Sequence, residues 1–256
     1  MLSLFIRYVK SRVLIDSPSS NEAAAYHRQW RKTPGGLRVR IAVLTFEGFN
    51  EIDSLVSSHI LNRVAVDGWK AEITCPTEMV QSRNGVRLMA QQPLEFANEA
   101  DVVLFGSGCL TAQLVEDPAI TSRLRLDPTR QLIGSQCSGA LFLAKLGLLR
   151  TLPVCTDLKT RPLLEAAGVF VLDQTFFASG TLASAGGCLS SPCLATWVIW
   201  SLLDRAAAEA ALDYVAPVGE RAQFISAALA AVAPFITPDT RQAVGGVVSD
   251  LPARTR

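Results

Sequence analysis

Short apolar runs alternate with segments of helical periodicity along most of this sequence, and this alternation is the feature that most limits its fold. Strands are predicted at residues 38–44, 69–75, 101–105, 131–136 and 169–172, and helices at 52–66, 138–148, 159–167, 194–203 (or starting slightly earlier) and 222–232. Strands that alternate with helices form βαβ units, whose strands are parallel. We therefore predict an α/β fold, a parallel sheet with helices on both faces and functional residues at the carboxyl ends of its strands.

The chain is predicted to hold one domain, residues 38–236, between an N-terminal extension at 1–37 and a C-terminal tail at 237–256. The first sixteen residues are apolar but contain Arg7, Lys10 and Arg12, so they match neither a membrane span nor a secretory signal. Residues 17–37 are rich in Ser, Pro, Gly and charge and are typical of a linker. A transit peptide, or a start codon placed too far upstream, is the alternative to a loosely ordered extension.

The charge and cysteine content narrow the class of protein. Lys and Arg total 24 against 23 Asp and Glu, which leaves no field to attract nucleic acid or an anionic membrane, so the expected partner is a small-molecule substrate. The six cysteines form no CxxC pair and there are only two histidines, so neither a metal nor a cofactor is expected. This cysteine usage predicts a reducing, cytoplasmic setting.

The strongest chemical signal is Cys137, which lies between the strand at 131–136 and the helix at 138–148. A residue on such a sharp turn projects over the sheet edge, and the helix N-terminus there favours a thiolate. The N–H of Ser138 would point to a developing oxyanion, and Gly106, Ser107 and Gly108 after the neighbouring strand could supply a second donor. The alternative is a buried cysteine at an ordinary strand–helix turn.

Four segments in this order give the region from about 38 to 235 its resemblance to the ThiJ/PfpI family: RIAVLTFEGFNEID, VVLFGSG, GSQCSGALFLAKLGLL and ASAGGCLSSPCLATWVI. The third, over sixteen residues, is the most specific. The chain is most similar to the isonitrile-hydratase branch and to related sensor domains. This resemblance implies a flavodoxin-like, class I glutamine-amidotransferase-like fold and a homodimer.

The same resemblance implies roles for individual residues. It places the nucleophile on Cys137, the adjacent hydroxyl on Ser138 and the acid of the first loop on Asp53. Glu51 is the rival acid, since other branches have a glutamate near that place. Residues two apart on a helix do not share a face, so we expect only one of the two to reach the thiol, and we favour Asp53.

The chain also departs from the family pattern, because no histidine lies near the nucleophile. Ser138 stands where many relatives have histidine, and Asp157 stands where the isonitrile-hydratase branch has another. Asp157 is therefore a candidate for proton transfer or substrate orientation, with a helix N-cap as its alternative role. Of the two histidines in the chain, His59 is expected to be structural and His27 to lie in the linker. Cys155, Cys188 and Cys193 are expected to be core thiols.

These observations predict a thiol-dependent hydratase or hydrolase acting on a small electrophilic molecule, with Asp53 moving the proton and Cys137 adding to carbon. The alternatives are a sensor with a reactive but non-catalytic cysteine and a stress protein whose Cys137 oxidises reversibly. A transcription factor is not expected, because only one helix and a tail are predicted after Asp204.

Removal of residues 1–36 should leave folding intact, because their composition departs from the α/β pattern that begins at Arg38. A chain beginning at Leu37 should melt within a few degrees of the full chain in a thermal scan followed by circular dichroism. An insoluble product would contradict the linker assignment.

Overall fold

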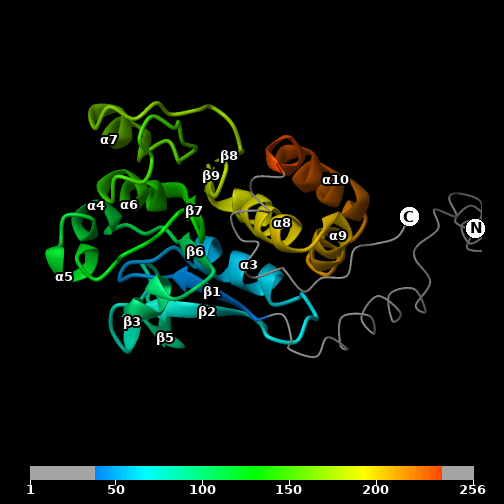
Figure 1. Cartoon of the computed structure of the whole chain (residues 1–256), viewed down its shortest axis with the longest axis horizontal. Coiled ribbons are helices and arrows are strands. Elements are labelled where there is room, and N and C mark those ends of the chain that lie inside the picture. Colours follow the sequence, from blue (N-terminus) through cyan, green and yellow to red (C-terminus); the bar gives the residue numbers. More distant parts are fainter. Residues whose placement is uncertain (1–37, 238–256) are drawn as a thin grey trace, which may run out of the picture.

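A seven-stranded sheet forms the centre of the protein in the computed structural model, which describes residues 38–237 (Figure 1). Its order is β5-β2-β1-β6-β7-β9-β8, and all neighbours are parallel except β8 and β9. A separate antiparallel hairpin pairs β3 with β4. The strands are β1 (Val39–Leu44), β2 (Trp69–Cys75), β3 (Met79–Gln81), β4 (Arg87–Met89), β5 (Gln92–Pro93), β6 (Val102–Phe105), β7 (Leu132–Gln136), β8 (Phe176–Ser179) and β9 (Leu182–Ala185).

Helices cover both faces of the sheet, and the side chains of β1 show how the faces divide. Ile41 and Val43 belong to a core shared with α3, α8, α9 and α10, whereas Ala42 and Leu44 belong to a second core with α5, α6 and α7. Successive residues of a strand point to opposite faces, so a continuous apolar run serves both cores. The helices are α3 (Glu51–Leu61), α4 (Thr111–Leu114), α5 (Pro118–Thr121), α6 (Ala140–Lys145), α7 (Arg161–Ala166), α8 (Ser191–Leu202), α9 (Arg205–Asp213) and α10 (Arg221–Val232), with 3-10 helices η2 (Leu94–Asn98), η3 (Cys137–Gly139), η4 (Cys188–Ser190) and η5 (Ala233–Phe235).

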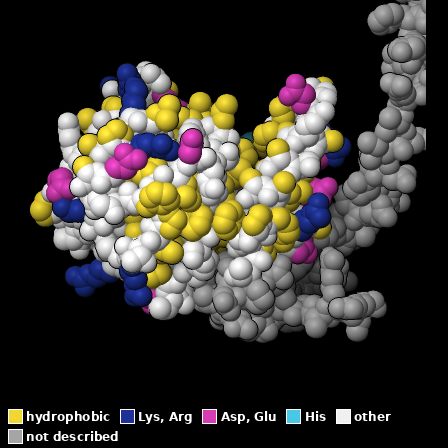
Figure 2. Space-filling model, turned by 90° about the horizontal axis from the view of Figure 1, so that it is seen from above, with side chains coloured by type: hydrophobic (Ala, Val, Ile, Leu, Met, Phe, Trp, Pro, Cys, Tyr) yellow, Lys and Arg dark blue, Asp and Glu magenta, His cyan; other side chains and the backbone are white. Residues whose placement is uncertain are grey.

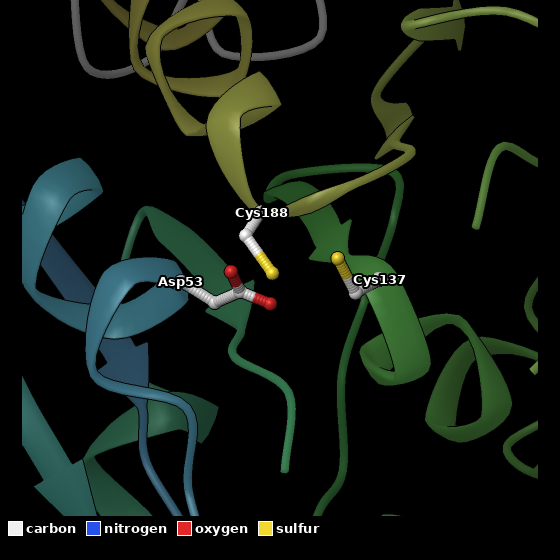
Figure 3. A group of neighbouring side chains, drawn as sticks. All are labelled: Asp53, Cys137 and Cys188. Atoms are coloured by element: carbon white, nitrogen blue, oxygen red, sulfur yellow. The ribbon is translucent and has the colours of Figure 1, made fainter. Parts of the chain in front are cut away.

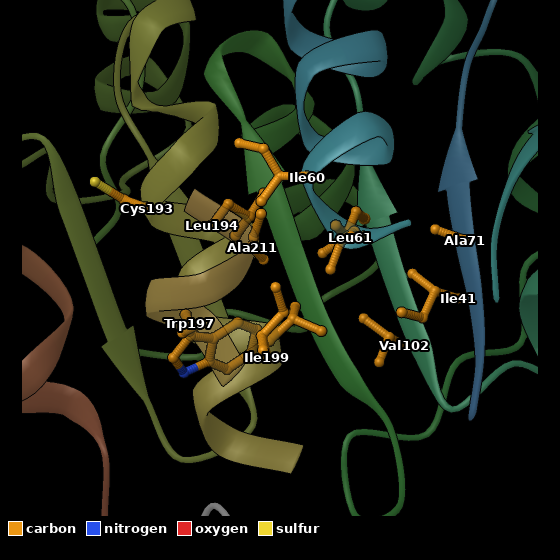
Figure 4. Close-up of a cluster of buried hydrophobic side chains, with 14 of the residues drawn as sticks. Ile41, Ile60, Leu61, Ala71, Val102, Cys193, Leu194, Trp197, Ile199 and Ala211 are labelled. Atoms are coloured by element: carbon orange, nitrogen blue, oxygen red, sulfur yellow. The ribbon is translucent and has the colours of Figure 1, made fainter. Parts of the chain in front are cut away.

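The first core is the larger one, and α8 lies at its centre (Figure 4). Eleven of the twelve residues of α8 are buried, including Leu194 and the fully buried Trp197. The Cβ of any larger residue at Gly134 of β7 would come within 2.7 Å of Leu194 Cδ1. A glycine therefore lets α8 lie close against the sheet.

The predicted flavodoxin-like α/β fold is confirmed, and four of the five predicted strands are present. The fifth, at 169–172, is wrong: within it only Val171 forms a bridge, to Val154. The sheet edge beside β7 is occupied instead by β9, with β8 outside it. Both strands are only four residues long and end at or near glycine. So short a segment shows little alternation of apolar and polar residues, and neither strand was predicted.

Several helix bounds also differ from those predicted. The helix predicted at 52–66 ends at Leu61, because the Asn62 side chain bonds to the backbone of both Ser58 and Ala71. The helix after Cys137 opens as η3 and ends at Lys145, before Gly147 with its φ of 69°. The start of α8 at Ser191 agrees with the expected earlier beginning.

The prediction of one helix after Asp204 is wrong, since both α9 and α10 follow it. The buried face of α9 consists of Ala207, Ala208, Ala211 and Leu212, and small alanines give a weak apolar pattern. Both helices pack on α8 within the first core, so they belong to the domain and do not form a separate module.

The predicted extension at 1–37 and the tail beyond residue 237 lie outside the described residues. Within residues 38–237, none of the helices has the combined length and apolar character that crossing a bilayer requires.

Shortening Leu194 to alanine should lower the free energy of unfolding by about 2–5 kcal/mol, because it leaves a cavity between α8 and the sheet. Leu189→Ala is the matched control, since this side chain is 83% exposed and its loss should change stability by less than about 0.5 kcal/mol. Urea unfolding followed by fluorescence measures both. Equal midpoints for the two variants would contradict the central place of α8 in the core.

Candidate active site

Four adjacent parallel strands bring their following loops to one edge of the sheet. These strands are β1, β6, β7 and β9, and their loops lead to Asp53, Ser107, Cys137 and Cys188 respectively. Side chains far apart in the sequence therefore meet at one place (Figure 3). This is the carboxyl edge where α/β proteins bind their ligands.

Cys137 has a backbone conformation typical of a nucleophile on a sharp strand-to-helix turn. Its φ is 48°, in the left-handed region that non-glycine residues rarely adopt, and η3 follows at once. Gly139 makes the turn possible, because a Cβ there would lie 2.5 Å from the carbonyl oxygen of Phe105. The local geometry agrees with the predicted elbow.

Two sets of hydrogen bonds hold this turn in place. The Thr156 hydroxyl donates to the carbonyl oxygen of Cys137 over 2.8 Å. The Ser138 hydroxyl oxygen accepts from the Gly108 N–H over 3.2 Å and lies 3.0 Å from the Thr111 hydroxyl. Ser138 thus joins the cysteine turn to the glycine-rich loop after β6, and this contact holds the turn in position.

Asp53 is the carboxyl group that the fold brings to Cys137. It lies in the first turn of α3, is 2% exposed, and accepts a short hydrogen bond at Oδ2 from the Ser107 hydroxyl. Ligand atoms of Asp53, Cys137 and Cys188 all lie within 4.8 Å of one another. In Figure 3 the carboxyl group points toward the two sulfur atoms.

Glu51, the rival acid, faces elsewhere. Its carboxylate accepts hydrogen bonds from the Ser82 hydroxyl over 2.5 Å and from the Asn84 amide over 3.1 Å. These bonds lower the pKa of Glu51, the Ser82 bond most. Glu51 therefore stays ionised and tied to the loop before β4, although it lines the same cavity as the cysteines.

Asp157 makes its hydrogen bonds within its own turn. Its Oδ1 accepts from the N–H groups of Lys159 and Thr160, and its Oδ2 accepts from the Thr160 hydroxyl. These bonds close a turn ahead of α7, whose N-cap is Thr160, so Asp157 is not the helix N-cap that was the alternative to a catalytic role. Asp157 also lines the cavity, from where its charge contributes to raising the pKa values of Asp53 and Cys137.

Cys188 was expected to be a core thiol, and this is wrong. It is half-buried, lines the cavity, and accepts a hydrogen bond at Sγ from the Asn50 side chain over 3.1 Å. Cys155 and Cys193 are core thiols as expected, and burial raises the pKa of each to about 11. The sequence holds one signal for Cys188: two glycines precede it directly after a strand, as in the glycine loop after β6.

Asn50 is a second residue that the sequence did not single out. It is the N-cap of α3, where its side-chain oxygen accepts from the Ile52 N–H over 3.1 Å. The amide nitrogen of the same side chain donates to Cys188. Asn50 therefore holds the start of α3, which carries Asp53, against the loop that carries Cys188.

Burial dominates the electrostatics of the site. It raises the pKa of Asp53, and the Ser107 hydroxyl and neighbouring thiols only partly offset this. Burial followed by the negative charge of Asp53 raises the pKa of the Cys137 thiol strongly. Desolvation at this buried position thus opposes the lowering of that pKa that the helix N-terminus was expected to give.

The loop at 106–108 has one free amide for the expected oxyanion role. The Gly106 N–H donates to Leu44 O and the Gly108 N–H to Ser138 Oγ. The Ser107 N–H is bonded to no other described residue. Together with Ser138, at the start of η3 where helix N–H groups lack helical partners, it forms the candidate donor pair.

A cavity of about 1210 Å³ opens beside the cysteines. Cys137, Ser138, Ser107 and Cys188 line it, whereas Asp53 does not and lies behind the thiols. On the face shown in Figure 2, positive and negative side chains are interspersed among hydrophobic ones. The arrangement can support attack of a thiol on an electrophilic atom in the cavity, with a carboxyl group as proton acceptor and donor.

Comparison with known proteins identifies the fold. The model of the DJ-1/PfpI family matches residues 39–199. The structure is similar to DJ-1 of Schizosaccharomyces pombe (17% identity, TM-score 0.58, 70% of this chain and 100% of that one). It is also similar to a mutant of a DJ-1 superfamily protein from Salmonella typhimurium (23% identity, TM-score 0.60, 69% of this chain and 97% of that one). A third similar structure is oxidized DJ-1 of Toxoplasma gondii (18% identity, TM-score 0.59, 69% of this chain and 97% of that one). Comparison with curated protein sequences gives no significant match.

Asp53→Asn should move the alkylation of Cys137 to lower pH. The substitution removes the negative charge of Asp53 and replaces its carboxylate with a weaker, neutral acceptor; both features of Asp53 raise the thiol pKa, so the thiolate of the variant forms at lower pH. Glu51→Gln is the matched control and should leave the profile unchanged, because Ser82 and Asn84 hold that carboxylate. Mass mapping of the Cys137 peptide after brief alkylation across a pH series measures this. A shift in Glu51→Gln alone would assign the acid to Glu51.

Proposed function

The chain belongs to the DJ-1/PfpI family, and we propose that it is a cysteine-dependent hydratase or hydrolase of a small electrophilic molecule, of the isonitrile-hydratase kind. One observation carries this proposal: the thiol of Cys137 lies on a strained turn, open to a cavity on one side, with the carboxyl group of Asp53 on the other. This arrangement supplies a candidate nucleophile and a candidate proton acceptor without a histidine.

The first step follows from the buried pair. Both groups are almost fully shielded from solvent and lie within 4.8 Å of each other, so Asp53 is the acceptor available for the proton that leaves the thiol. The sulfur forms a bond to the terminal carbon of the isonitrile, and Asp53 then delivers the proton to that carbon. The product of this step is a thioimidate, S–CH=N–R, and no atom is gained or lost.

The second step regenerates the thiol. Asp53, which does not itself line the cavity, takes a proton from water through the Ser107 hydroxyl, the water oxygen adds to the thioimidate carbon, and the nitrogen receives that proton. The carbon–sulfur bond then breaks, the hydroxyl proton returns to sulfur through Asp53, and an N-substituted formamide leaves. The amides of Ser107 and Ser138 would stabilise negative charge on the oxygen during this collapse.

Two features support a small molecule over a larger partner. The cavity is lined by residues from several segments far apart in the sequence, including those that carry Cys137 and Cys188, as expected of a small-molecule site. The charges on the face shown in Figure 2 are of both signs, without the basic stripe of a nucleic-acid site.

A second candidate function is a redox-responsive protein in which Cys137 does not turn over. The Cys188 thiol next to Cys137 favours it, because a peroxide that oxidises Cys137 to a sulfenic acid releases water, and condensation with Cys188 then gives a disulfide and a second water. Steady-state turnover separates the two, since oxidation without a reductant is a single stoichiometric event.

Purified protein incubated with a small alkyl isonitrile should form the corresponding formamide over many turnovers, measured by chromatography. Cys137→Ser should abolish this turnover, and Asp53→Asn should lower kcat by about a hundred-fold, as expected for loss of a general acid–base. Glu51→Gln, the same change in a carboxylate held by Ser82 and Asn84, should cost much less.

Circular dichroism of each variant controls for misfolding. Formamide limited to one equivalent per chain, or full turnover in Asp53→Asn, would refute the proposed mechanism. A larger loss in Glu51→Gln than in Asp53→Asn would transfer the role to Glu51.

A further inference from the structure

We propose that Asp53, Cys137 and Cys188 form a binding site for a thiophilic divalent cation of the zinc type. Each residue offers one ligand atom, a carboxylate oxygen or a sulfur, and these three atoms all lie within 4.8 Å of one another (Figure 3). The site shares two residues with the proposed reaction, but it does not depend on that reaction being correct.

The donor set suits this class of cation. Zinc binds cysteine sulfur at about 2.3 Å and carboxylate oxygen at about 2.0–2.2 Å in tetrahedral geometry, which places neighbouring donors roughly 3.3–3.8 Å apart. Donors already within 4.8 Å need only side-chain adjustments of about an ångström to reach this arrangement. Two sulfur ligands favour zinc over magnesium or calcium, which prefer oxygen.

Asp53 carries the observation that points most directly to a ligand. Its Oδ2 is engaged by the Ser107 hydroxyl, while its Oδ1 is buried and lies within normal hydrogen-bond geometry of no described residue, with the Cys137 and Cys188 thiols facing the carboxyl group. A buried carboxylate oxygen without a partner is costly, and a bound cation would relieve that cost.

The neighbours of the three ligands resemble the outer shell of a metal site. Ser107 donates to Asp53, Asn50 donates to Cys188 over 3.1 Å, and the Gln136 amide lies 3.8 Å from the sulfur of Cys137. Such donors orient ligands and stabilise the negative charge of thiolates. Gln136 is held in turn by its hydrogen bond to the Gly187 carbonyl over 2.6 Å.

The site would be of the open kind. Three protein ligands leave the fourth tetrahedral position for water or another small molecule, and both cysteines line the cavity through which the cation would enter. Cysteine binds a cation as the thiolate, so binding must displace the thiol protons and the apparent affinity should rise with pH. A bound cation would also hold the Cys137 sulfur and prevent its covalent chemistry.

The test is direct titration of the full-length, reduced, metal-free protein, with no substrate present. Cobalt(II) should give one equivalent of binding with a sulfur-to-cobalt charge-transfer band in the near ultraviolet, and zinc should abolish that band. Zinc affinity, measured by competition with a chromophoric chelator, should fall by at least about ten-fold in Cys188→Ser and in Asp53→Asn. Cys109→Ser, the same change in an exposed thiol of the cavity outside the cluster, should bind as the unaltered chain does.

A second measurement uses the unaltered chain and so does not depend on any variant folding. Saturating zinc should protect Cys137 and Cys188 together from alkylation and leave Cys109 reactive. Absence of saturable binding, unchanged affinity in Cys188→Ser, or protection of Cys137 alone would overturn the site. If the protein binds zinc but shows no isonitrile turnover when assayed with a chelator, only the proposed function is refuted. If it turns over isonitrile but does not bind zinc, only the metal site is refuted.

Discussion

The parallel pairing of β1, β6, β7 and β9 is the constraint on which the site depends. Leu44 pairs with Phe105, Phe105 with Ser135, and Ser135 with Ser184, so one row of residues crosses four strands. Each strand then ends within a residue or two of this row, and its loop begins at the same edge. A slip of register in any one of them would carry its functional side chain away from the others.

Close packing then decides which side chain each loop presents. The left-handed backbone of Cys137 costs of order 1–3 kcal/mol, and surrounding contacts must maintain it. Those contacts are the Thr156 hydroxyl on the Cys137 carbonyl and the approach of Gly139 to the end of β6. The thiol is consequently aimed at Asp53 and the cavity rather than into the core.

The chemistry of the site follows from placing one carboxyl group and two thiols where water is largely excluded. None of the three ionises easily there, because burial penalises each charged form. A reaction that needs a negative charge here must therefore place it on one member of the group by transferring a proton between members, share it through hydrogen bonds within the group, or have it neutralised by a bound cation. The proposed proton transfer and the proposed metal site are two consequences of this same arrangement.

The sequence alone determined the alternation of strands and helices and the turn at Cys137, because each depends on local pattern, and its resemblance to the ThiJ/PfpI family gave the preference for Asp53. It could not determine the β8–β9 edge or α9, whose short or alanine-rich segments carry little periodicity. Nor could it show that Cys188, over fifty residues from Cys137 along the chain, lies beside it. Only the tertiary structure decided that, because sheet order and register, rather than sequence spacing, set which loops meet and which buried groups shift one another's pKa.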